Sequence, residues 1–322
     1  MFATAPIYTP DTAFARNVAE GLNRQRGKFL HASWLYDEIG SALFEAITLL
    51  PEYGLTRADT RLLASAAGEI VRAADRPRVF VELGSGSGSK TRTILDAATR
   101  SGPVTYLPID ISRAALDHCA KTLSSMNAVR VEPIEATYLD GIELALNHRR
   151  ADERAMILFL GSTIGNFNRT KAAKFLRQVR SRMQPGDSLL LGADLVKSRD
   201  RLLLAYDDPT GVTAAFNLNL LARINRELGG HFDLTQFAHE ARWNERWSRV
   251  EMHLRARTAQ QVRIDALGLT VSFSRGETIW TESSHKFRAE DIVRLGARGG
   301  WACARQWVDR EWGFAETLFQ PQ

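Results

Sequence analysis

The stretch VFVELGSGSGSKTRT, from Val79 to Thr93, indicates the fold of this chain. An apolar run gives way to alternating glycine and serine, and then to residues that resume as a helix. This is the pattern of a strand, a tight loop and a helix start. Gly84, Gly86 and Gly88 can adopt positive φ and bring backbone N–H groups against a ligand. The segment therefore predicts an α/β protein whose loop binds a nucleotide-like molecule.

The spacing of this loop does not fully match either of two patterns that bind phosphate groups. The dinucleotide pattern G-x-G-x-x-G, begun at Gly84, requires a third glycine or alanine where this chain has Ser89. The phosphate-loop pattern G-x-x-x-x-G-K-[ST] fails at the same position, although Lys90 and Thr91 match it. A nucleoside triphosphatase therefore stays an alternative, and a structural glycine turn is a second one.

A third pattern starts at Glu82 and reads E-x-G-x-G-x-G. It requires an acidic residue at the end of the next strand to hold ribose hydroxyls, and Asp110 in YLPIDIS stands there. This combination resembles motif I and the acidic loop of class I methyltransferases, whose cofactor is S-adenosylmethionine (SAM). The resemblance implies a Rossmann-like sheet and a cofactor without phosphate.

Length and composition limit the remaining possibilities. With 322 residues and 44% hydrophobic content, the chain can form one large domain and a second, appended one. The two cysteines, Cys119 and Cys303, have no histidine or cysteine at metal-ligand spacing beside them, so neither a disulfide framework nor a metal site is predicted.

The chain shows no sign of a membrane or nucleic-acid partner. MFATAPIYTPDTAF, from Met1 to Phe14, lacks the pattern of a signal peptide, and no apolar run reaches the length of a membrane span, so we predict a cytoplasmic protein. The net charge of +5 could favour RNA, but acidic residues interrupt the basic clusters. A solvated surface is the preferred interpretation, and an RNA methyltransferase stays an alternative.

Residues 60 to 195 alternate between strand and helix signals, as expected for a parallel sheet covered by helices. Ser112 and Thr170 are predicted N-caps of two of the helices. The predicted strands are Val79–Leu83, Thr105–Ile109, Val129–Pro133, Ala155–Leu160 and Ser188–Gly192.

The character of the sequence changes after Lys197. From Trp243 to Phe287 the apolar period becomes two, which predicts antiparallel strands, and the tail from Trp301 to Phe319 is again strand-like. We therefore predict an α+β substrate-binding domain at 197–286, inserted into a SAM-binding domain at 60–196 and 287–322. Residues 1–59 form a predicted N-terminal helical segment that contributes to the substrate pocket.

Two segments are candidates for binding the methyl acceptor. GSTIGNF follows a predicted strand, where ligands of α/β sheets bind, and its Asn166 offers both a donor and an acceptor. In TIWTESSHKF, residues two apart share a strand face, which groups Trp280, Glu282 and Ser284. An aromatic residue with a carboxylate and a hydroxyl could hold a ring with N–H groups. From the pattern alone, the solvated face of a strand is the simpler interpretation.

Several long segments of the chain resemble the L-histidine Nα-methyltransferases that make hercynine in ergothioneine biosynthesis. The resemblance covers nearly all of the chain, and these segments have no generic reason to occur. They are YDEIGSALFEAIT, LPEY with TRAD, VELGSGSGSKTR, PIDIS, FLGSTIGNF, PGDSLLLGADLVK, AYDDPTGVTAAFN, INRELGG, ARWN and TESSHKF.

The resemblance implies a role for each matching residue, with L-histidine as the small-molecule substrate. The implied SAM-binding residues are Gly84, Ser85, Gly86, Lys90, Asp110, Thr137 and Tyr138. The implied substrate residues are Asn166 and Tyr206 for the carboxylate, Tyr53 for the imidazole, Glu282 and Ser284 for its two nitrogens, Met252 for the shape of the ring pocket, and Tyr36 near the reacting amine. Without the resemblance, the three tyrosines and Met252 would be interpreted as core residues. The resemblance further implies a monomer, and a methyltransferase of another amino acid such as tryptophan is the closest alternative.

The chain departs from the pattern of the family at two places. Gly54 and Leu55 stand where Tyr-Pro is expected, which affects the loop that carries Tyr53. Thr137 and Tyr138 stand where an acidic residue followed by an aromatic one is common, so the hydrogen bond to the adenine amine should be weaker.

Overall fold

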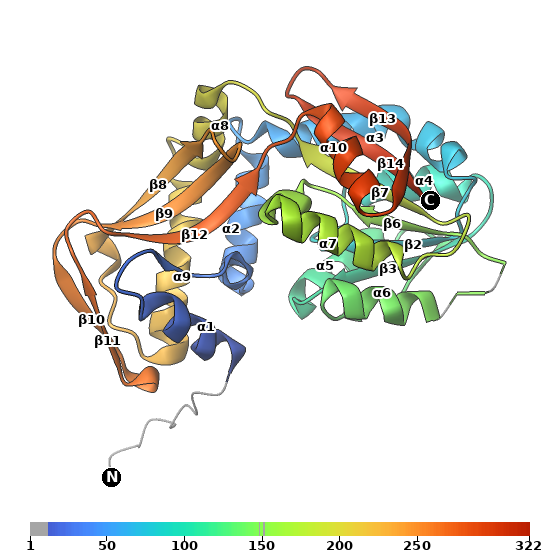
Figure 1. Cartoon of the computed structure of the whole chain (residues 1–322). Coiled ribbons are helices and arrows are strands. Elements are labelled where there is room, and N and C mark those ends of the chain that lie inside the picture. Colours follow the sequence, from blue (N-terminus) through green and yellow to red (C-terminus); the bar gives the residue numbers. More distant parts are fainter. Residues whose placement is uncertain (1–11, 148, 151) are drawn as a thin grey trace, which may run out of the picture. The chain divides into compact units, whose positions relative to one another are not determined.

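The computed structural model describes residues 12–147, 149–150 and 152–322 (Figure 1). The chain forms two compact units. The small unit combines the chain up to Tyr53 with Ser198–Ser284, and the large unit combines Gly54–Lys197 with His285–Gln322. The predicted boundaries at 59/60, 196/197 and 286/287 compare with 53/54, 197/198 and 284/285 in the structure. The beginning of the predicted segment 1–59 lies outside the described residues.

The large unit is built on an eight-stranded sheet whose main path has the order β13-β14-β7-β6-β2-β3-β4, with β5 paired to β3. Strands β2, β3, β4, β6 and β7 are parallel, whereas β14 runs antiparallel to β7 and β13. The strands are β2 (Val79–Leu83), β3 (Val104–Asp110), β4 (Val129–Val131), β5 (Ile134–Glu135), β6 (Ala155–Phe159), β7 (Ser188–Asp194), β13 (Trp301–Asp309) and β14 (Phe314–Pro321). The prediction that strands after the insertion complete the first sheet is confirmed.

Helices cover both faces of this sheet, and the central strands β2, β6 and β7 are therefore buried along their whole length. In β2, Val81 packs into one apolar core and Phe80 into the other. The core around Val81 includes residues of α6 (Tyr138–Asn147), α7 (Arg169–Arg180) and α10 (Ala289–Arg298), and the core around Phe80 includes residues of α3 (Gly54–Ala73), α4 (Thr91–Thr99) and α5 (Arg113–Leu123).

One of the two predicted N-caps is confirmed and the other is wrong. Ser112 caps α5 as predicted, since its hydroxyl accepts the N–H of Ala115. The prediction for Thr170 is wrong. Helix α7 begins two residues earlier than expected, and the Asn168 side chain accepts the N–H of Lys171.

The small unit contains a four-stranded sheet of order β1-β12-β9-β8 and the hairpin β10-β11. Its strands are β1 (Lys28–Phe29), β8 (Phe237–Asn244), β9 (Arg249–Ala256), β10 (Gln260–Ile264), β11 (Leu269–Phe273) and β12 (Thr278–His285). Its helices are α1 (Ala13–Leu22), η1 (Ala32–Leu35), α2 (Glu38–Leu49), α8 (Arg199–Tyr206), α9 (Val212–Leu228), η3 (Leu234–Gln236) and η4 (Asp265–Leu267). Strand β1, which pairs in parallel with β12, was not predicted, and β8 begins six residues before the expected start of the strands.

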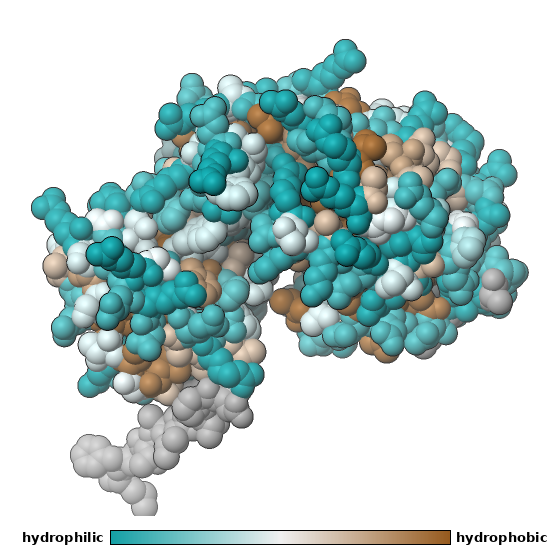
Figure 2. Space-filling model, viewed as in Figure 1, coloured by the Kyte–Doolittle hydropathy of each residue, from teal (hydrophilic) through white to brown (hydrophobic). Residues whose placement is uncertain are grey.

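The surface of both units is mostly hydrophilic, with apolar residues in small patches (Figure 2). Among the described residues, no helix combines the length and the apolar character needed to cross a membrane. The basic cluster near residue 150 is partly neutralised within the unit, because Arg149 is paired with the buried Asp187 at 2.7 Å.

Candidate functional site

The glycine loop lies at the carboxyl end of β2, beside the point in the sheet where the order of the strands reverses. The chain runs from β2 to β3 on one side, and β6 lies on the other side, which is where ligands of open α/β sheets bind. Gly84, Gly86 and Gly88 have φ of 73°, 50° and 69°. A Cβ at Gly88 would lie 2.5 Å from the sulfur of Cys119, so a side chain at that position has no room.

Asp110 and Tyr138 lie beside this loop. Oδ1 of Asp110 accepts the N–H of Ser112 at 2.9 Å, and the backbone N–H of Gly86 also contributes a hydrogen bond to its carboxylate. Burial raises the pKa of Asp110, and these hydrogen bonds oppose the rise. The Tyr138 hydroxyl lies 3.1 Å from the position of a Cβ on Gly84, and burial together with the charge of Asp110 raises its pKa to about 12. The structure thus brings three predicted cofactor segments together.

The remaining predicted cofactor residues surround the loop in the same unit. Ser85 is buried within it. Thr137 is exposed at the start of α6, and its hydroxyl donates to Asp140 Oδ2 at 2.6 Å. The Lys90 ammonium donates to Asp59 Oδ2 at 2.6 Å, and its side chain is 25% exposed.

The geometry of this loop speaks against the triphosphatase alternative. The Thr91 hydroxyl, which would have to bind magnesium, is buried and donates to Glu82 Oε2 at 2.6 Å. The positive-φ glycines and the acidic residue at the end of β3 instead fit SAM.

Asn166 ends the short helix η2 (Thr163–Asn166), which follows β6. Its side chain is exposed, whereas the backbone before it is fixed: the Gly165 carbonyl oxygen is 2.9 Å from His285 Nδ1, and a Cβ on Gly165 would lie 2.8 Å from the His285 carbonyl oxygen. Ser162 adopts φ of 62°, in the left-handed region that a serine rarely occupies. The loop therefore has a defined shape that presents Asn166 at the end of the strand.

In the small unit, Tyr206 and Ser284 form the central contact among the predicted substrate residues. The Tyr206 hydroxyl donates to Ser284 Oγ at 2.8 Å, and both side chains are buried. The carbonyl oxygen of Tyr206 lies 2.7 Å from His239 Nε2, and Asn217 on α9 contacts the other ring nitrogen of this histidine at 2.9 Å. The end of α8 is thereby fixed to β8 and α9.

A chain of aromatic rings connects the three predicted tyrosines within the small unit. Tyr53 lies edge-on to Tyr206 with a centroid distance of 6.0 Å, and Phe44 lies 6.4 Å from Tyr53. Tyr36 contacts both Phe44 and Phe216 at 5.5 Å. Phe44 and Phe216 were not predicted as site residues. The three tyrosines therefore occupy one continuous aromatic cluster.

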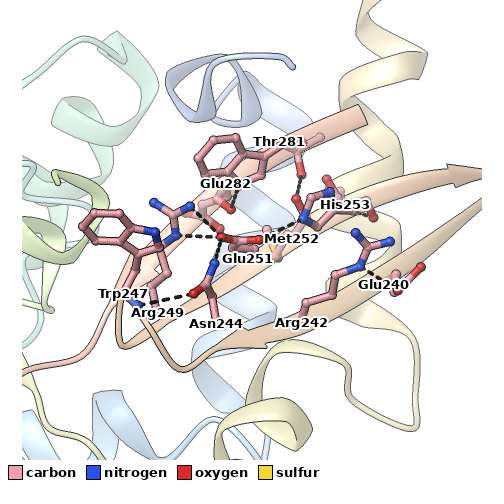
Figure 3. Close-up of polar contacts among 12 residues, drawn as sticks. Glu240, Arg242, Asn244, Trp247, Arg249, Glu251, Met252, His253, Thr281 and Glu282 are labelled. Atoms are coloured by element: carbon pink, nitrogen blue, oxygen red, sulfur yellow. Dashed lines mark hydrogen bonds and ion pairs between the residues drawn. The ribbon is translucent and has the colours of Figure 1, made fainter. Parts of the chain in front are cut away.

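Glu282 and Met252 lie on the neighbouring strands β12 and β9 (Figure 3). Met252 is 2% exposed, and its carbonyl oxygen accepts the Thr281 hydroxyl at 3.0 Å. Glu282 is half-buried, and its carbonyl oxygen accepts the indole N–H of Trp280 at 2.8 Å. The Trp280 ring stacks with the His253 ring at a centroid distance of 6.5 Å, and Ser284 contacts Tyr206. That Trp280, Glu282 and Ser284 share one face of the strand stays a prediction.

A polar network occupies β8 and β9 beside these residues (Figure 3). Glu251 accepts hydrogen bonds from Asn244 at 2.9 Å and from Arg249 at 2.7 Å, and Glu240 accepts from Arg242 at 2.7 Å. Burial raises the pKa of Glu251, but these donors hold it below its ordinary value. The carboxylates of this network are thus satisfied by the protein itself.

Sequence reasoning missed two buried acidic residues near Lys90, namely Asp59 and Glu316. Glu316 stands in the apolar strand sequence FAETLF, and a charged residue within such a strand was a usable signal. Asp59 stands in the TRAD segment, which was noted without a role being assigned to this residue.

The comparisons with known proteins agree with this geometry. The model of a family described as "Histidine-specific methyltransferase, SAM-dependent" matches residues 14–321. The chain is 42% identical over 308 residues to the histidine N-alpha-methyltransferase of Mycolicibacterium smegmatis, covering 95% of this chain and 94% of that one, and the values for the protein of the same name from Mycobacterium tuberculosis are the same. It is 32% identical over 280 residues to ergothioneine biosynthesis protein 1 of Schizosaccharomyces pombe, which covers 84% of this chain and 36% of that protein.

Proposed function

The chain belongs to the family of histidine-specific, SAM-dependent methyltransferases, and from this premise we propose that it methylates the α-amino nitrogen of L-histidine to the trimethylated betaine hercynine, in ergothioneine biosynthesis. Transfer of methyl groups from SAM to histidine follows from the family. The degree of methylation and the role of each residue are proposals. A monomer in the cytoplasm stays a prediction from the sequence.

The large unit supplies the proposed cofactor site. When bound, SAM supplies a methyl group that is electrophilic because it is attached to a sulfonium. The backbone of Gly84, Ser85 and Gly86 approaches the cofactor closely because the two glycines have no side chain, and Asp110 accepts hydrogen bonds from the ribose hydroxyls. Lys90 pairs with the cofactor carboxylate. The adenine side is formed by Thr137 and Tyr138. The positive-φ glycines and the contact of Asp110 with Gly86 support this assignment.

The proposed histidine-binding residues hold the substrate at its two ends. Glu282 and Ser284 bind the two imidazole nitrogens, since a carboxylate accepts an N–H and a hydroxyl can donate to the other nitrogen. Tyr53 contacts the imidazole and Met252 shapes the pocket around it. Tyr206 binds the substrate carboxylate, together with Asn166. The observation that carries the assignment is the hydrogen bond of 2.8 Å from Tyr206 to Ser284, because it joins two of the proposed histidine-binding residues in one buried contact.

Orientation of the amine accounts for most of the proposed catalysis. Methyl transfer is an in-line displacement that requires an unprotonated amine, and fixed orientation can lower such a barrier by about 7 to 11 kcal/mol. In this proposal, the Tyr36 hydroxyl lies near the amine and accepts a hydrogen bond from it. This hydrogen bond directs the lone pair of the amine nitrogen toward the methyl group. Each transfer forms an N–C bond, breaks the S–C bond of SAM and leaves SAH and a protonated amine. The amine must lose this proton to water, and SAM must replace SAH, before the next transfer. Because the substrate is held at both ends, the amine can rotate between transfers and accept three methyl groups in turn.

Glu282 sets the preference for histidine over tryptophan or another amino acid. A site built to accept an N–H rejects a ring without one at the right place, since the carboxylate would be left unsatisfied. The tryptophan alternative predicts instead that a substrate with an indole ring is methylated at least as fast.

The proposal is tested with purified protein, SAM and each amino acid separately, with products weighed by mass spectrometry. We expect mono-, di- and trimethylated histidine in sequence. We expect Glu282→Ala to reduce kcat/KM for histidine at least 100-fold, while calorimetry shows unchanged binding of S-adenosylhomocysteine (SAH). The matched control is Glu240→Ala, since Glu240 lies on β8 of the same sheet and is paired with Arg242. Equal rates for Glu282→Ala and wild type would refute the role of Glu282, and preferred methylation of tryptophan would refute the proposed substrate.

A further inference from the structure

Two carboxyl groups lie buried together in the large unit, next to the lysine of the glycine loop. Asp59 on α3 and Glu316 on β14 are both 0% exposed. Glu316 pairs across the sheet with Gly192 of β7, and a Cβ at Gly192 would lie 2.7 Å from Glu316 Oε1. The missing side chain of this glycine thus provides the space that the Glu316 carboxyl occupies.

The hydrogen-bond partners of this pair are distributed unequally. Oδ2 of Asp59 accepts the Lys90 ammonium at 2.6 Å and the N–H of Gly161 at 3.2 Å. Oδ1 of Asp59 and both carboxyl oxygens of Glu316 have no hydrogen-bond donor among the described residues. Two ionised carboxylates can only accept, so neither can satisfy the other. Leaving three oxygens unsatisfied in the interior would be costly.

A single proton on Glu316 supplies the donor that Asp59 Oδ1 lacks and reduces the number of oxygens without a donor from three to one. Glu316 Oε1 lies on the same side of Gly192 as Gly161, since a Cβ on Gly192 would be 2.7 Å from that oxygen and 3.3 Å from the Gly161 nitrogen, whose N–H donates to Asp59. A proton on Glu316 converts one acceptor into a donor for Asp59. Burial, followed by the negative charge of Asp59, raises the pKa of Glu316 well above its ordinary value, against the opposing effect of the Lys90 ammonium. Glu82 raises the pKa of Glu316 further when it is ionised, and its Oε2 is already bound by Thr91 and Tyr106.

Resting on the proposed function, we propose that Glu316 is a positioning residue for the cofactor: its protonated carboxyl donates to Asp59, and Asp59 then holds the Lys90 ammonium and the N–H of Gly161. Lys90 belongs to the glycine loop, and Gly161 begins the segment that leads to Asn166. The buried carboxyl pair therefore links the loop that binds SAM to the loop proposed to bind the substrate carboxylate. Glu316 itself contacts neither ligand.

The test compares two substitutions that differ in their ability to donate. Glu316→Gln retains a neutral donor of similar size, and Glu316→Leu retains the volume without a donor. We expect the Kd for SAH, measured by calorimetry without histidine, to stay within about twofold of wild type in Glu316→Gln and to rise about tenfold in Glu316→Leu. At saturating SAM, kcat should change less than the KM for SAM in both variants.

Thr317→Val is the matched control. Thr317 is the next residue of β14, is equally buried, and accepts a hydrogen bond from Gln306 at 2.9 Å. This variant loses a buried hydrogen bond on the same strand, so its SAH affinity should equal that of wild type. Unchanged SAH affinity in Glu316→Leu, or an equal loss in Glu316→Gln and Glu316→Leu, would overturn the proposal.

A second measurement avoids dependence on the folding of Glu316→Leu. Infrared difference spectra of wild type against Glu316→Gln at pH 7 should show the C=O stretch of a protonated carboxylic acid, present only in wild type. A difference spectrum that shows only the bands of an ionised carboxylate for Glu316 would overturn the proposal. The proposed function is tested separately by histidine methylation, because neither readout uses histidine.

Discussion

The indole N–H of Trp312 donates a hydrogen bond of 3.0 Å to Oδ1 of the buried Asp194. Asp194 also accepts the ammonium groups of Lys197 at 2.5 Å and of Lys286 at 2.9 Å. These two lysines flank the places where the chain leaves the large unit and returns to it, and Gly54, at the remaining boundary, packs against the Trp312 ring. One cluster thus lies at all three points of the sequence where the chain passes from one unit to the other.

The first prediction concerns Gly54. A Cβ at this position would lie 2.2 Å from Cε3 of Trp312, whose ring is fixed by Asp194, so Gly54→Ala should destabilise the protein by about 1 to 3 kcal/mol. Urea unfolding measures this change. The matched control is Gly68→Ala in the same helix, where the nearest atom is Nη1 of Arg72 at 3.4 Å, and which should stabilise the protein by up to about 1 kcal/mol. Equal stability of the two variants would contradict the packing described here.

This contact explains why the chain has a glycine where its family resemblance implies a tyrosine. The departure was visible in the sequence, but its cause was not, because Trp312 lies far along the chain from Gly54. The same limit applies to Asp59, Lys90 and Glu316, which come from three separate segments and meet only in the folded unit. By contrast, the glycine loop and Asp110 were predictable, since strand, turn and helix follow one another locally and each residue type has a direct conformational reason.

The second prediction concerns Asp194. Asp194→Asn leaves Lys286, which is 0% exposed, without its carboxylate partner, so we expect a loss of about 3 to 5 kcal/mol in the free energy of unfolding at pH 7. Asp117→Asn, which removes the exposed partner of Arg113, serves as the control and should change little.

The pH dependence provides a second check on Asp194. Burial raises its pKa, but the two lysines hold it below the ordinary value, so its contribution is complete above the unfolded-state pKa of about 4 and is lost as the pH falls further. The difference between wild type and Asp194→Asn should therefore be constant above about pH 5 and should shrink below pH 4. A difference that grows on acidification would contradict this role.

The third prediction concerns the coupling of Tyr206 and Ser284. If their hydrogen bond organises the histidine site, Tyr206→Phe and Ser284→Ala should each raise the Kd for histidine, and the double variant should lose less than the sum of the two. A coupling energy of about 1 kcal/mol is expected. Calorimetry with SAH present measures the four Kd values of wild type, the two single variants and the double variant. Tyr106→Phe, whose hydroxyl donates to Glu82 in the large unit, should show no coupling with Ser284→Ala. Strict additivity for Tyr206 and Ser284 would refute their joint role.

The last prediction concerns Glu82, the acidic residue that begins the glycine motif. Burial raises its pKa to about 7, although hydrogen bonds from Thr91 and Tyr106 and the charge of Lys90 oppose the rise. Between the ordinary value of 4.5 and about 7, the folded protein therefore binds this proton more tightly than the unfolded chain does. The contribution of Glu82 to stability should fall as the pH rises through this window and should be constant above it.

Glu82→Gln isolates this contribution, because glutamine does not titrate and Glu316 is present in both proteins. At 1.36 kcal/mol for each pKa unit, the free energy of unfolding of wild type relative to Glu82→Gln should decrease by on the order of 3 kcal/mol between about pH 4 and pH 7. Urea unfolding at a series of pH values measures this difference. A difference independent of pH would show that Glu82 is ionised throughout. Since the Thr91 hydroxyl, at the start of α4, donates to Glu82, such a result would also mean that the end of the glycine loop is held by a buried carboxylate instead of a neutral acid.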